Sequence, residues 1–199
     1  MNDNVLKDDE IITAVLAGNS RDFEILINRY SAKIIKFIGS MTADRDEAQS
    51  IAQDVFIKIY QNLAYYKPQD NFSAYIFKIA KNMTLNWLNR QKRTVFFSRL
   101  LGREFNQPQF RLAPVHAVGP EAAEREDKIT RNLRLLPEEQ RIALILKVYL
   151  EFSYKQIREI SGWSIPKIET LISRAKSRLK KNLALQERNP DIVLEAREK

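Results

Sequence analysis

Apolar residues recur at every third or fourth position along most of this chain of 199 residues. That spacing is the period of an α-helix with one buried side, and it differs from the strict alternation of a half-buried strand. The spacing predicts an all-α protein. The expected helices span residues 8–17, 21–38, 44–63, 72–93, 124–135, 137–150, 153–160 and 164–185.

The helical period fails between Thr94 and Ala123, a segment that contains three prolines and two glycines. Such a composition is typical of a tether between folded units. We therefore expect two small helical domains joined by a flexible linker. The predicted boundaries are a first domain over residues 1–93, the linker over 94–123, a second domain over 124–185 and a charged tail over 186–199.

The composition argues against several classes of protein. The absence of cysteine excludes disulfides and thiolate metal sites, and no apolar run reaches the roughly 18 residues that span a membrane. The single histidine, His116, lies in the predicted tether. Glycine-rich phosphate loops and metal-spaced His or Cys sets are missing. We therefore expect a cytoplasmic protein that is not an enzyme, with no catalytic residue, metal or cofactor and no membrane insertion of its own.

Positive charge is concentrated in two blocks, within a net charge of +8. Residues 78–103 contain seven basic residues and no acid, and residues 167–181 contain six basic residues and one acid. Two basic blocks at helical spacing predict two surfaces that contact nucleic-acid phosphates.

Residues 153–175 have the pattern of a helix-turn-helix: a short helix, a turn at Gly162 and a longer basic helix. In such a motif the second helix presents its first residues to base edges in the major groove. An ordinary helical hairpin is the alternative interpretation.

The helix predicted over residues 72–93 combines cations with aromatic Tyr75 and Trp87 and with the amides of Asn82, Asn86 and Asn89. Amides read base edges and aromatic rings stack on exposed bases. An amphipathic core helix with a solvated charged face is equally compatible with this pattern.

Taken in order, these segments resemble the extracytoplasmic-function (ECF) class of bacterial RNA polymerase sigma factors. Residues 23–63, with the sequence Gln53-Asp54-Val55-Phe56, resemble the first half of sigma region two. Residues 72–93 are similar to its DNA-melting half, and residues 136–175, beginning Leu136-Pro137, are similar to sigma region four.

The resemblance implies partners and sites. The partners would be core RNA polymerase, promoter DNA and an anti-sigma factor. The residues facing core polymerase would be Gln53, Asp54, Val55, Phe56 and Ile59. A flipped base of the minus-ten element would enter the loop formed by Gln69, Asp70, Asn71 and Phe72. The residues along minus-ten DNA would be Tyr75, Lys81, Asn82, Asn86, Asn89, Arg90 and Arg93. Those at the minus-thirty-five element would be Ser164, Lys167, Ile168, Glu169, Thr170, Arg174, Lys176 and Arg178.

Two rival interpretations use the same residues. A helix-turn-helix regulator that never touches polymerase would need a dimerisation or ligand domain in the front half, where the sequence instead has the Gln53–Phe56 helix. A single-strand RNA-binding adaptor would use the basic block over residues 78–103 but would leave the helix-turn-helix unexplained.

Overall fold

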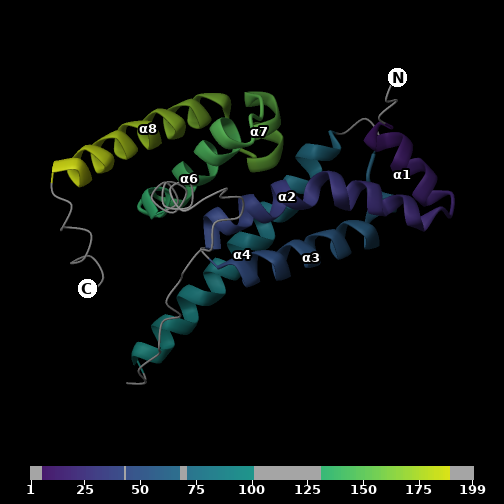
Figure 1. The fold of residues 1–199 in the computed structure, drawn as a ribbon, viewed down its shortest axis with the longest axis horizontal. Coiled ribbons are helices and arrows are strands. Elements are labelled where there is room, and N and C mark those ends of the chain that lie inside the picture. The colour runs from purple at the N-terminus through teal and green to yellow at the C-terminus, as the bar shows by residue number, and fades with distance from the viewer. Residues whose placement is uncertain (1–5, 43, 68–70, 101–130, 189–199) are drawn as a thin grey trace. The chain divides into compact units, whose positions relative to one another are not determined.

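The computed structural model describes residues 6–42, 44–67, 71–100 and 131–188, with side chains described up to residue 94 in the third range and 185 in the fourth. Within these ranges every regular element is a helix (Figure 1), as the spacing of apolar residues predicts. The chain divides into two compact units, one built mainly on residues 1–112 and the other mainly on residues 113–199. Most of the predicted linker and the end of the predicted tail lie outside the described residues.

The first unit is a helical bundle in which α2, α3 and α4 pack pairwise and α1 lies against α2. Its elements are α1 (Asp8–Leu16), the 3₁₀ turn η1 (Ser20–Asp22), α2 (Phe23–Thr42), α3 (Arg45–Gln61), the 3₁₀ turn η2 (Leu63–Tyr65) and α4 (Phe72–Leu100).

Local signals set two of these boundaries. The carboxylate of Asp44 accepts hydrogen bonds of 3.0 Å from the backbone N–H groups of Asp46 and Glu47, and so caps the start of α3. Gly18 follows α1 with a φ of +110°, a conformation that favours glycine and stops the helix where the sequence predicts.

The core of the first unit is built on the predicted apolar stripes. The fully buried rings of Phe37 and Phe77 meet edge to face, with centroids 5.9 Å apart. On α3 the buried stripe consists of Ala48, Ile51, Ala52, Val55, Phe56 and Ile59. Helix α1 buries Ile11, Ile12 and Val15, whereas Leu16 at its last position is 52% exposed.

Helix α4 is longer than its apolar pattern predicts, because it continues beyond Arg93 to Leu100. The chain has no glycine or proline between Pro68 and Gly102, so nothing in this stretch interrupts the backbone hydrogen bonds. Loss of an amphipathic period shows that a helix leaves the core; it does not show that the helix ends.

The second unit contains a short helical segment over residues 131–134, then α6 (Glu138–Leu144), the π-helical turn η3 (Ile145–Tyr149), α7 (Tyr154–Ser161) and α8 (Ile165–Arg188). The π-helical turn was not expected, and α8 continues three residues beyond the predicted end. α6 packs on α8, and buried Ile142, Ile145, Ile157, Ile168 and Ala175 contribute to the core.

Candidate polymerase and nucleic-acid interfaces

One face of α4 carries a row of polar and aromatic side chains. The spacing of three or four residues places its members on the same side of the helix. We call this row the amide face; it consists of Tyr75, Lys78, Asn82, Asn86, Asn89 and Arg93. All are exposed except Tyr75, which is half-buried and whose hydroxyl pKa is raised by that burial. The face therefore offers amides, cations and one ring to solvent.

Other residues predicted along minus-ten DNA lie beside the amide face. Lys81 and Arg90 each neighbour one of its asparagines in sequence, so they are rotated about 100° away from it. Trp87 is half-buried on the inner side and is not part of the amide face. Gln69 and Asp70 lie outside the described residues.

Four aromatic rings gather where α4 begins: Tyr30, Tyr66, Phe72 and Tyr75. Ring centroids are 5.6 Å apart for Tyr30 and Phe72, 5.4 Å for Tyr66 and Phe72, and 5.3 Å for Tyr66 and Tyr75. Phe72 is only 3% exposed, so its ring belongs to the core and offers no open stacking surface. Tyr75 belongs both to this aromatic cluster and to the amide face, so the two adjoin.

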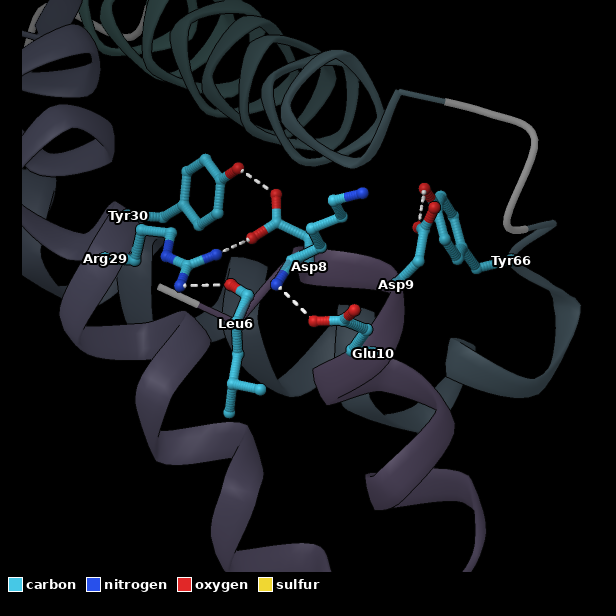
Figure 2. A network of polar contacts seen from close by, with 8 residues as sticks. Leu6, Asp8, Asp9, Glu10, Arg29, Tyr30 and Tyr66 are labelled. Carbon is cyan, nitrogen blue, oxygen red and sulfur yellow. Dashed lines mark hydrogen bonds and ion pairs between the residues drawn. The ribbon is translucent and has the colours of Figure 1, made fainter. Parts of the chain in front are cut away.

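A polar network ties the start of α1 to this cluster (Figure 2). The Asp8 carboxylate pairs with Arg29 and accepts a 2.5 Å hydrogen bond from the Tyr30 hydroxyl. The Asp9 carboxylate accepts a 3.1 Å hydrogen bond from the Tyr66 hydroxyl. The sequence analysis does not predict this network, because the partners are 21 to 57 residues away in the chain.

Helix α3 separates its predicted polymerase-contact residues into two groups. Gln53 and Asp54 are exposed, as a docking role requires. Val55, Phe56 and Ile59 are buried in the core of the first unit, with at most 7% exposure, and cannot reach a partner in this conformation. The outer surface instead has two apolar residues that the sequence analysis omitted: Ile57, 54% exposed, and Tyr60, 47% exposed.

The helix-turn-helix forms where the sequence predicts it. Ser153 and Gln156 form a reciprocal cap at the start of α7, with hydrogen bonds of 3.2 and 2.9 Å. Gly162 adopts a φ of +77°, and its N–H donates to the carbonyl of Arg158 at 2.8 Å. This left-handed residue turns the chain sharply into α8.

The residues predicted to read minus-thirty-five DNA are exposed, with one exception; Ser164 immediately precedes α8 and the rest lie on it. Ile168 is fully buried and serves the core. Spacing places the others on two flanks: Lys167, Thr170, Arg174 and Arg178 on one, and Glu169 and Lys176 on the other. Thr170 already donates its hydroxyl to the carbonyl of Pro166 at 2.9 Å.

Lys167 is engaged within the second unit. Its Nζ forms a 2.8 Å ion pair with Oε1 of Glu139 and lies 5.1 Å from the ring centroid of Trp163. Sequence reasoning placed Lys167 on DNA without these partners, because Glu139 belongs to another helix. Within the described part of the chain no group of His, Cys, Asp and Glu could hold a metal, and no helix is long and apolar enough to cross a membrane.

Two family models match the chain in the order of its two units. Sigma-70 region 2 matches residues 26–94, and Sigma-70, region 4 matches residues 126–179. RNA polymerase sigma factor YlaC of Bacillus subtilis is 27% identical over 165 residues, which cover 80% of this chain and 91% of YlaC. ECF RNA polymerase sigma factor SigW of the same organism is 26% identical over 176 residues, covering 86% and 94%. The chain belongs to the ECF sigma factors.

Solved sigma factors share the fold. CnrH, in complex with the cytosolic domain of CnrY, matches with a TM-score of 0.68 and 19% identity over 89% of this chain and 97% of that chain. RpoE from Bartonella quintana, in complex with the anti-sigma factor NepR, matches with a TM-score of 0.68 and 24% identity over 82% and 98%.

In this sigma factor the region 2 match starts within α2, so α1 and its acidic residues precede it. The region 4 match covers α6 and α7 and ends at residue 179, before the last turns of α8.

Proposed function

We propose that this sigma factor binds core RNA polymerase and directs promoter recognition and DNA melting for transcription initiation. The amide face of α4 is the observation that carries the proposal. It places exposed asparagines and cations on one helix surface, in a stretch that has no acid between Lys78 and Arg103. The first domain, with α1 to α4, would bind core polymerase and minus-ten DNA. The second domain, with α6 to α8, would bind minus-thirty-five DNA. A linker would join the two, and the protein would act in the cytoplasm.

Core polymerase would bind the outer surface of α3. Gln53 and Asp54 supply hydrogen-bonding groups, and exposed Ile57 and Tyr60 supply apolar area of the kind that anchors protein interfaces. Val55, Phe56 and Ile59 would contribute from inside, by fixing the helix that presents this surface.

The amide face would lie along the minus-ten element. Asparagine amides can pair with the exposed edge of adenine, while Lys78 and Arg93 neutralise phosphates. Stacking of an unpaired base on Tyr75 would offset an unpairing cost of a few kcal/mol. Binding energy would then drive melting without nucleotide hydrolysis by this chain.

Helix α8 would enter the major groove at the minus-thirty-five element. Arg174 and Arg178 on one flank and Lys176 on the other can reach phosphates. Glu169 repels phosphate but can accept a hydrogen bond from the amine of a cytosine. Cations on both flanks would therefore position α8 on the DNA backbone, and Glu169 would contact a base.

The regulatory partner would be an anti-sigma factor. The solved structures of CnrH and RpoE contain CnrY and the anti-sigma factor NepR, respectively. Their overall fold matches that of this chain, so a comparable partner is compatible with the described surfaces.

Reconstitution tests the proposal. We expect the full chain to co-purify with core polymerase and to support run-off transcription from a matched promoter, whereas the chain alone should bind duplex DNA weakly. Asp54→Ala together with Ile57→Ala should weaken core binding, with Lys33→Ala on the exposed surface of α2 as control. A stable, specific operator complex at physiological salt without polymerase would instead support a helix-turn-helix regulator.

A further inference from the structure

Helix α1 precedes the region 2 match, yet its first turn is bonded to the beginning of α4 through the aromatic cluster (Figure 2). Asp8 and Asp9 are adjacent, and each accepts a hydrogen bond from a different tyrosine, Tyr30 and Tyr66. Ordinary packing of an amphipathic helix requires neither bond, because Ile11, Ile12 and Val15 already bury the apolar side of α1.

Tyr66 connects α1 to the DNA-facing surface. Its side chain is 5% exposed, its hydroxyl donates to Asp9, and its ring lies 5.3 Å from that of Tyr75. Packing restrains the body of a ring, whereas a hydrogen bond to a carboxylate fixes its far end, and bonds to charged groups are the stronger ones. Asp9 is therefore linked to the Tyr75 ring through the Tyr66 side chain.

Tyr30 supports the same cluster from the other side. Its hydroxyl donates to Asp8, and its ring contacts Phe72 at 5.6 Å. Phe72 in turn lies 6.2 Å from Tyr75. Asp8 is thus linked to Tyr75 through the rings of Tyr30 and Phe72.

We propose that Asp9 and Tyr66 are positioning residues for promoter melting, holding the Tyr75 ring in the orientation at which an unpaired promoter base stacks on it. The inference rests on the proposed function and concerns the melting step alone. Neither residue touches DNA in this account, so core binding and transcription from an already open template should not need their hydrogen bond.

The test uses the full chain with core polymerase and two templates, a duplex promoter and the same promoter with a mismatched, pre-melted minus-ten segment. Fluorescence of 2-aminopurine in the minus-ten segment reports melting. We expect Tyr66→Phe, which removes the hydrogen bond, to slow melting of the duplex by about two- to tenfold, and Asp9→Asn, which removes the charge that strengthens the bond, to slow it by up to the same factor. Transcription from the pre-melted template should stay within about twofold of wild type.

Two comparisons sharpen the test. The double variant should melt the duplex no more slowly than Tyr66→Phe alone, because Tyr66→Phe already removes the hydrogen bond that Asp9→Asn weakens. Tyr65→Phe removes a neighbouring hydroxyl from a side chain that is 81% exposed, and it should melt the duplex like wild type.

Equal losses on both templates would overturn the inference, because they would indicate a general loss of folding or core binding. Wild-type melting rates in Tyr66→Phe and Asp9→Asn would also overturn it, while leaving the proposed function intact. Failure of the wild-type chain itself to melt any matched promoter would refute the proposed function instead.

Discussion

Nζ of Lys167 lies 2.8 Å from Oε1 of Glu139, so an ion pair joins the first turn of α8 to the first turn of α6. Both side chains are well exposed, at 43% and 50%, and such pairs contribute at most about 1 kcal/mol. The pair is therefore weak enough for DNA to compete with it, and it withholds one cation from the helix that would enter the groove.

Glu139→Gln should strengthen promoter binding by the holoenzyme. The substitution releases the Lys167 ammonium to pair with a phosphate, so the salt dependence of binding should become steeper by up to about one unit. Binding isotherms over a range of salt concentrations measure both effects. Glu159→Gln removes the same charge from exposed α7 and serves as control. Unchanged or weaker binding in Glu139→Gln would show that Lys167 braces the motif and does not contact DNA.

Arg93→Ala should weaken promoter binding and flatten its salt dependence by up to about one unit, because Arg93 continues the amide face with a phosphate-binding cation. Arg90 lies off this face, so Arg90→Ala should have the smaller effect. Lys33→Ala removes an exposed cation from α2 and controls for net charge. Salt titrations of holoenzyme binding distinguish the variants, and equal slopes for all of them would exclude a phosphate contact at Arg93.

Substitution by alanine at two isoleucines two positions apart on α3 should affect two different properties, stability at Ile59 and core binding at Ile57. Ile59 is fully buried, so Ile59→Ala should lower the free energy of unfolding by about 2–5 kcal/mol. Ile57 is 54% exposed, so Ile57→Ala should change stability by less than about 0.5 kcal/mol but weaken binding to core polymerase. Urea denaturation and a core-binding assay provide the two measurements. If Ile57→Ala binds core polymerase as tightly as wild type does, the outer surface of α3 is not part of the interface.

The hydroxyl of Tyr30 should make stability depend on alkaline pH. Burial, and then the hydrogen bond to the Asp8 carboxylate, raise its pKa well above the ordinary value of 10.0. Above that pH the unfolded chain loses a proton that the folded chain keeps, so this contribution is complete below pH 10 and declines as the pH rises. Tyr30→Phe should therefore show a shallower alkaline loss of stability in denaturation curves between pH 8 and 11. The exposed-site variant Tyr65→Phe should follow wild type, and identical curves for Tyr30→Phe and wild type would contradict the assignment.

The sequence predicts the framework well because it depends on local patterns. The apolar stripe of α3, the Asp44 cap and the turn at Gly162 each reflect residues within a few positions of one another. Helical spacing also places the members of the amide face together, since one turn of helix relates each to the next.

What the sequence could not predict depends on distant partners or on which side of a helix is covered. Val55 and Phe56 belong to the sequence Gln53-Asp54-Val55-Phe56 that resembles the family, but such a motif does not say which of its side chains face the core. The ion pair of Lys167 with Glu139 joins two helices, and the hydrogen bond between Asp9 and Tyr66 spans 57 residues. Periodicity within one segment contains no information on either.

Because α4 is one continuous helix from Phe72 to Leu100, the distance along its axis between Tyr75 and Arg93 is fixed. At 1.5 Å per residue, Tyr75 and Arg93 are about 27 Å apart along the axis, which corresponds to about eight base pairs of DNA. In the proposed function, the base stacked on Tyr75 and the phosphate bound by Arg93 would therefore be separated by a constant distance, and promoters would tolerate changes of sequence between these points more readily than changes of spacing.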